Sequence, residues 1–163
     1  MTSEGGDTYR MSILKSEQRA VLSQVVPAPA DATLAIDAWM LAAADQPRDR
    51  FVTVTCRSQP AGSGYRLKVV PDAHVVSLAR LDNGVELPLG ERTLPALSGS
   101  ESHNAIELSC VGSTISASIN GAEAAVAHDA TYTQGGFVIG GGADSGVTRK
   151  VEILFKLTGL EQH

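Results

Sequence analysis

Apolar and polar residues alternate along most of this chain, which is the pattern of β-strands that bury one face. The segment 32–41 places four apolar residues on one side: Leu34, Ile36, Ala38 and Met40. Similar alternation runs through 51–58, 64–70, 104–111 and 114–119. No segment keeps a helical period over about ten residues. The pattern therefore predicts a protein built almost entirely of strands.

Turn signals separate the predicted strands at regular intervals. Asn120-Gly121 and Asn83-Gly84 favour tight hairpins, because both turn residues take positive φ. The segment 42–49 is expected to hold at most a short turn, since Pro47 would stop a longer helix. The other expected strands are 8–14, 19–26, 74–81, 85–89, 123–128, 135–142 and 148–157. About a dozen short strands with one apolar face each indicate an antiparallel sandwich or barrel, with two sheets around one core.

Composition and charge narrow the class of protein. The chain has 163 residues and is expected to form one domain over 1–163. The net charge is −5 and the basic residues are scattered, which argues against a nucleic-acid partner. No apolar run reaches the roughly 20 residues that span a bilayer. The polar start, MTSEGGDTYR, is no signal peptide, so an exported protein would carry its leader or anchor outside this sequence.

The sequence contains no pattern typical of a catalytic site. Glycoside hydrolysis on a strand needs carboxylates at alternating positions, because period-two spacing brings both to one face. The acidic residues of the expected strands instead stand singly. None of the four histidines lies near a G-x-S-x-G nucleophile motif. We therefore expect no catalytic residues.

The glycine run at 140–146 and two acidic loop residues are the remaining candidates for ligand sites. The run lacks the Lys and the following helix that a phosphate loop requires, so we interpret it as sheet geometry. Asp129 and Asp144 are the candidates for a calcium ion. Calcium takes six to eight oxygen ligands, and these two acids are not close in sequence, so no metal site is predicted.

The second half of the chain resembles a known family. NAIELSCV, TISASING, EAAVAH, the segment 132–142 and VEILFKL follow the order of strands and turns in concanavalin A-like lectin/glucanase jelly rolls. The closest similarity is to the laminin-G-like modules of bacterial surface and secreted proteins. The first half matches more loosely. The resemblance implies an all-β fold, an antiparallel β-sandwich of the concanavalin A-like jelly-roll type.

The resemblance also bears on Cys56 and Cys110. Their spacing alone allows two reduced core thiols or a disulfide. In related bacterial modules one Cys ends a GVVCR-like strand and a second precedes a VG turn, and TVTCRS and ELSCVG match both positions. The resemblance therefore implies a disulfide, and with it an oxidising, extracytoplasmic compartment such as the cell surface.

The candidate ligand-binding residues surround the single tryptophan. Alternation puts Trp39 on the polar side of its strand beside Asp37, where an indole could stack on a sugar ring. If neighbouring strands follow the family order, the same surface would also carry Thr55, Arg57, Arg66 and Lys68. The alternative is that Trp39 packs beneath a loop or the N-terminal segment.

These observations lead to three ranked functions. The first is a non-catalytic module that binds carbohydrate or a cell-surface glycoconjugate. The second is a protein-interaction or sensor ectodomain of a membrane-anchored protein, with no sugar ligand. The third is a degenerate glycoside-processing enzyme, which the missing carboxylate motif disfavours.

Overall fold

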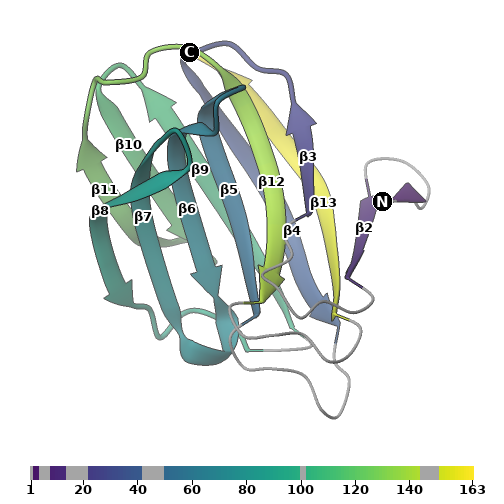
Figure 1. Cartoon of the computed structure of the whole chain (residues 1–163). Coiled ribbons are helices and arrows are strands. Elements are labelled where there is room, and N and C mark those ends of the chain that lie inside the picture. The colour runs from purple at the N-terminus through teal and green to yellow at the C-terminus, as the bar shows by residue number, and fades with distance from the viewer. Residues whose placement is uncertain (1, 4–7, 14–21, 42–49, 100–101, 144–150) are drawn as a thin grey trace.

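The computed structural model describes residues 2–3, 8–13, 22–41, 50–99, 102–143 and 151–163. Two antiparallel sheets make up almost all of this part of the chain (Figure 1). One sheet contains, in chain order, β1 (Thr2–Ser3), β2 (Thr8–Ile13), β4 (Ala32–Leu41), β9 (His103–Val111), β10 (Thr114–Ile119), β11 (Ala122–His128) and β13 (Val151–Gln162). The other contains β3 (Leu22–Val26), β5 (Arg50–Gln59), β6 (Ser63–Val70), β7 (Val75–Asp82), β8 (Val85–Thr93) and β12 (Gly136–Ala143).

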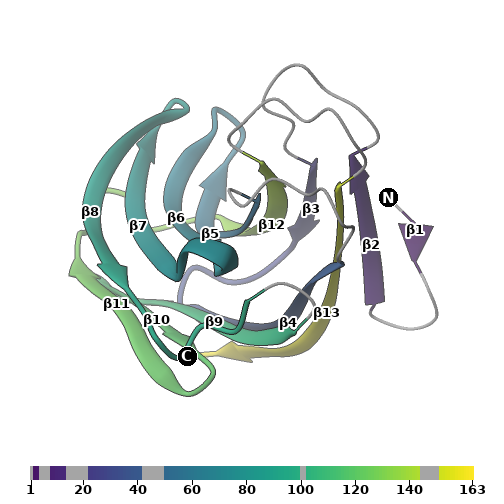
Figure 2. The same ribbon diagram turned by 90° about the horizontal axis from the view of Figure 1, so that it is seen from below.

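The strand orders show how the chain passes between the sheets. The seven-stranded sheet has the order β1-β2-β13-β4-β9-β10-β11, and the six-stranded sheet has the order β3-β12-β5-β6-β7-β8. Figure 2 shows the two sheets as facing layers. The 3₁₀ turn η1 (Pro71–Ala73) is the sole helical element within the described ranges. The expected turn at 42–49 lies outside them.

The alternating apolar residues meet between the layers. Leu34 and Leu108 from the seven-stranded sheet, and Val54 and Leu67 from the six-stranded sheet, are at most 1% exposed. They belong to one continuous core. The predicted antiparallel sandwich is therefore confirmed, and its cause is the burial of one apolar face per sheet.

The two predicted hairpin turns have the expected backbone conformation. Asn83, Gly84, Asn120 and Gly121 all have positive φ, at 52°, 83°, 52° and 79°. Gly141 of the glycine run lies inside β12, where an added Cβ would be 2.9 Å from the backbone oxygen of Phe51. Close backbone approach therefore accounts for a glycine at this position.

A disulfide joins the two sheets. Cys56 of β5 is bonded to Cys110 of β9, and their Cα atoms are 6.5 Å apart. The predicted pairing is confirmed, and it crosses the core. Closing a loop with a sequence separation of 54 residues stabilises the fold by about 4 kcal/mol in the chain-entropy model.

Two strands are longer than the sequence pattern predicts. β8 continues to Thr93. It is an edge strand with nearly all of its residues exposed, so apolar and polar residues do not alternate in its second half and the sequence pattern does not reveal it. β13 continues to Gln162 past an irregular pairing between Leu157 and Gly159, which interrupts the alternation. Periodicity marks a strand only where one face is buried.

Candidate functional site

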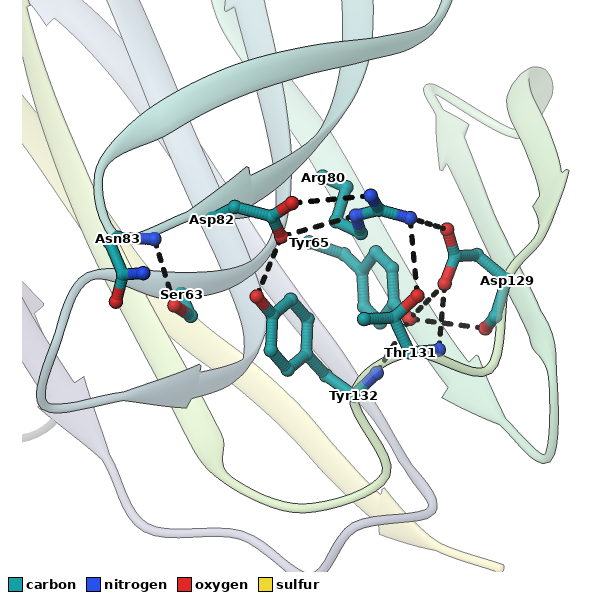
Figure 3. A network of polar contacts seen from close by, with 8 residues as sticks. All are labelled: Ser63, Tyr65, Arg80, Asp82, Asn83, Asp129, Thr131 and Tyr132. Carbon is teal, nitrogen blue, oxygen red and sulfur yellow. Dashed lines mark hydrogen bonds and ion pairs between the residues drawn. The ribbon is translucent and has the colours of Figure 1, made fainter.

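The most extensive polar cluster lies where the chain leaves β11 and crosses towards β12 (Figure 3). We call Tyr65, Arg80, Asp82, Asp129 and Tyr132 the end cluster. Arg80 donates to Asp129 Oδ2 at 2.8 Å and to both carboxylate oxygens of Asp82 at 3.2 Å. The Tyr132 hydroxyl donates to Asp82 Oδ1 at 2.6 Å. The Tyr65 hydroxyl donates to Asp129 Oδ1 at 2.8 Å and accepts the Tyr132 N–H at 3.0 Å.

The surroundings of the end cluster lower the pKa of Asp129 and Asp82 and raise the pKa of Tyr65. Burial acts to raise the pKa of Asp129, but hydrogen bonds donated by Thr131, Tyr65 and Arg80 outweigh it and hold that pKa well below its usual range. Hydrogen bonds from Tyr132 and Arg80 lower the pKa of Asp82. Burial raises the pKa of the Tyr65 hydroxyl. Both carboxylates are therefore ionised and fully engaged by protein donors.

The end cluster is a scaffold element. Its charges face one another, and it ties β6 and β7 to the segment that follows β11. Asp129, a calcium candidate, uses its carboxylate on Arg80 and Tyr65, while Asp144 lies outside the described residues. Over those residues, no group of three or more His, Cys, Asp or Glu side chains is arranged to hold a metal ion.

Arg57 corrects one expectation from the sequence. It was predicted on the binding surface, but its side chain is 1% exposed. The pairing of β5 with β6 is irregular between Cys56 and Gln59, and Arg57 has a φ of 49°, so alternation fails there. The guanidinium donates to the carbonyls of Ala30 and Tyr132 at 3.1 and 2.9 Å and to Asp31 at 2.8 Å. Arg57 is a buried anchor for two loops.

The other predicted binding residues lie on two opposite faces. Asp37 and Trp39 belong to β4 in the seven-stranded sheet, whereas Thr55 belongs to β5, and Arg66 and Lys68 to β6, in the six-stranded sheet. The expectation that all of them share one surface is wrong. Strands β4 and β5 follow each other in the chain, but the chain changes sheets between them.

On the outer face of the six-stranded sheet, the predicted residues already have protein partners or are buried. Arg66 forms an ion pair with Glu86 at 3.0 Å. The Lys68 ammonium lies over the Phe51 ring, 4.4 Å from its centroid. Thr55 is only 4% exposed. This face therefore offers a ligand few accessible groups from the predicted set.

The outer face of the seven-stranded sheet differs. The rings of Trp39 and His103 are 5.8 Å apart and tilted by 34°. Asp37 lies opposite Lys156 of β13 in the strand register. Across the described part of the chain, Asp37, Lys156 and the indole N–H of Trp39 make no hydrogen bond or ion pair. We call Asp37, Trp39, His103 and Lys156 the Trp39 face.

Two of these residues were missed from the sequence. His103 pairs with Trp39 and Lys156 pairs with Asp37 across neighbouring strands. Alternation marks both positions as outward, but only the strand order shows which residues become neighbours. The order β13-β4-β9 brings together segments from the beginning, the middle and the end of the chain.

Comparison with known proteins identifies the fold. No protein family model matches the chain, and no curated protein matches it in sequence. Carbohydrate binding module CBM66 from Bacillus subtilis superposes with a TM-score of 0.67 at 16% identity, over 90% of this chain and 84% of that one. A protein of unknown function with a galectin-like fold, also from Bacillus subtilis, gives 0.66 at 13% identity over 96% and 89%.

A third solved structure points the same way. The galectin LEC-6 of Caenorhabditis elegans superposes with a TM-score of 0.55 at 15% identity, over 87% of this chain and 94% of that one. The fold is a galectin-type jelly roll. In this jelly roll the Trp39 face lies on the outer surface of the seven-stranded sheet, and the end cluster joins β6 and β7 to the segment that follows β11.

Proposed function

We propose that this jelly roll is a non-catalytic carbohydrate-binding module and that its ligand occupies the Trp39 face. The observation that carries the proposal is the half-buried indole of Trp39 beside Asp37 and Lys156, which have no protein partner among the residues that the structure describes. A sugar ring stacks its apolar face on an aromatic ring, while its hydroxyls exchange hydrogen bonds with neighbouring charged groups. Asp37 accepts such bonds and Lys156 donates them.

Two further facts support binding without hydrolysis. Proteins of the same fold include one named as a carbohydrate-binding module and several named as galectins. Hydrolysis of a glycosidic bond requires two carboxyl groups about 5–9.5 Å apart on either side of the bond. The outward positions of β4 and of β9 carry one carboxylate each, Asp37 and Glu107, so neither strand has the alternating carboxylates of a glycoside hydrolase strand.

We also propose that the protein works outside the cytoplasm, as a secreted or cell-surface module. The Cys56–Cys110 bond supports this location, because disulfides persist in oxidising compartments. Within the described residues, no helix has the length and apolar character needed to cross a bilayer.

A glycan array tests both the function and the face. The labelled wild-type protein is compared with Trp39→Ala and with Lys68→Ala, which alters the opposite sheet. We expect Trp39→Ala to weaken binding about tenfold or more, since an aromatic contact contributes about 1.5 kcal/mol. We expect Lys68→Ala to bind as the wild type does.

The possible results separate the two claims. Binding that survives Trp39→Ala but fails in Lys68→Ala would move the site to the six-stranded sheet. An absence of signal from folded wild-type protein on every glycan would contradict the function itself. Circular dichroism of each variant confirms that the fold is retained.

A further inference from the structure

We propose that the sugar site continues from the Trp39 face along β4 and β9 into a second subsite, and that the ligand is therefore an internal stretch of a linear, uncharged glycan. This inference rests on the proposed function. It adds the length of the ligand and its charge.

The second subsite is an open hollow on the same face of the seven-stranded sheet. It has a volume of about 260 Å³. Its polar lining comes from four strands: Thr33, Glu107, Ser109, Ser116, Ser118 and Glu123. We call these residues the hydroxyl depression. The sheet forms a hollow here because most of the outward side chains are short.

The strand register places these groups side by side. Thr33 lies opposite Ser109, Ser109 opposite Ser116, and Glu107 opposite Ser118. Thr33 donates to Ser109 at 2.8 Å, and Ser118 donates to Glu107 at 2.9 Å. The Ser116 hydroxyl makes no hydrogen bond within the part of the chain that the structure describes. Each hydroxyl can both donate and accept, which matches the hydroxyls of a sugar.

The Trp39 face and the hydroxyl depression form one continuous track. The outward side chains of β4 are, in order, Trp39, Asp37, Ala35 and Thr33, and the small side chain of Ala35 raises no barrier between the two subsites. Six residues of an extended strand cover about 20 Å, a length that exceeds a disaccharide and suits about four sugar rings. A terminal sugar in a closed pocket would need no such track.

Charge narrows the ligand further. Glu107 and Glu123 line the hydroxyl depression, and none of the described residues lining it is Lys or Arg. Glu123 is 73% exposed and lies 4.0 Å from Arg92, so its negative charge remains accessible. Sulfate or uronate groups on a glycan would be repelled by these carboxylates. The depression therefore favours an uncharged chain.

Calorimetry with oligosaccharide ladders tests the inference. Linear β-1,4-glucan, β-1,4-mannan, α-1,4-glucan and N-acetylglucosamine ladders of one to six rings are titrated into the full chain at one fixed pH. We expect the affinity to rise about tenfold or more between two rings and four rings. Carboxylated or sulfated chains of equal length are expected to bind more weakly.

Matched variants locate the effect. Ser116→Phe fills the hydroxyl depression and is expected to reduce the affinity for four rings to that for two, without changing the affinity for two rings. Ser77→Phe places the same side chain on the outer face of the six-stranded sheet and is expected to change neither. Should Ser116→Phe lower the melting temperature more than Ser77→Phe does, the milder pair Ser116→Ala and Ser118→Ala replaces it.

The outcomes distinguish this inference from the function on which it rests. Affinity that depends on Trp39 but is already maximal for two rings overturns the second subsite and leaves the proposed function intact. Tighter binding of an anionic chain overturns the assignment of charge. An absence of binding at every length, by a folded protein, overturns both proposals.

Discussion

The end cluster and the Trp39 face carry the same kinds of group and use them in opposite ways. In the end cluster, Arg80 is shared between two carboxylates, and both tyrosine hydroxyls bond to those carboxylates. On the Trp39 face, Asp37 and Lys156 make no hydrogen bond or ion pair within the described ranges. Polar groups that satisfy one another stabilise the scaffold, whereas groups left open remain available to a ligand.

This contrast matters because pKa shifts and dense hydrogen bonding, taken alone, would select the end cluster as the candidate site. The end cluster has the strongest shifts in pKa and the densest hydrogen bonding in the described structure, which are frequent marks of an active site. Structural ion-pair networks produce the same marks. The number of unused donors and acceptors separates the two cases here.

The largest loss of stability is expected from removal of the Cys56–Cys110 disulfide, which crosses the core. Replacing Cys56 and Cys110 together by Ala should lower the free energy of unfolding by about 4 kcal/mol, because the unfolded chain is no longer cross-linked. Urea unfolding measures this change, and reduction of the wild type should reproduce it. A sugar affinity that remains unchanged in the folded variant would support the separation of scaffold from site. A loss below about 1 kcal/mol would contradict the stabilising role of the bridge.

The next largest effect is the difference in stability between a variant of the buried Arg57 and a variant of the partly exposed Arg66. Arg57→Met should cost about 3 kcal/mol, because three hydrogen bonds are lost and two loop carbonyls lose a donor. Arg66→Met should cost less than about 1 kcal/mol, since it removes one surface ion pair. Equal losses in the two variants, measured by thermal unfolding, would show that burial is not the deciding factor.

Acid pH tests the end cluster by itself. Asp129 has a lower pKa in the folded state than in the unfolded state. Its stabilisation is fully present above the unfolded pKa of about 4, and it is lost as the pH falls through the folded pKa. We expect the unfolding free energy of the wild type to decrease below about pH 4. The variant Asp129→Asn should be about 2 kcal/mol less stable at pH 7 and should show a flatter acid limb. Parallel acid limbs would assign the pH dependence to other carboxyl groups.

The smallest changes in stability are expected on the Trp39 face. Asp37→Asn and Lys156→Met should each alter the unfolding free energy by at most about 0.5 kcal/mol, because neither residue has a partner in the described structure to lose. Both should nevertheless weaken binding of the best ligand from the glycan array several-fold. A clear loss of stability with unchanged binding would break the comparison and place these residues in the scaffold.

The sequence predicts the sandwich because strands and turns are marked by residues that are close together in the chain. Alternation identifies the buried face of β4 through Leu34 and Ile36, and Asn120-Gly121 sets the turn between β10 and β11. The proposed site depends instead on which strands become neighbours. The side chains of Thr55 and Trp39 are both predicted to point outward, yet they lie on opposite sheets. The position of Arg57 is predicted wrongly for a different reason. The pairing of β5 with β6 is irregular there, so the Arg57 side chain points inward where alternation predicts an outward one.

The position of β13 has a consequence for biosynthesis. This strand lies between β2 and β4, so each of these two strands lacks one neighbour until β13 itself has been translated. β12 likewise separates β3 from β5 in the other sheet. Neither layer can close during the early part of synthesis, and the nascent chain exposes unpaired strand edges throughout that time. Closure of the seven-stranded sheet must therefore wait for β13 to leave the ribosome, and a chain shortened within β13 would be released as an aggregation-prone product.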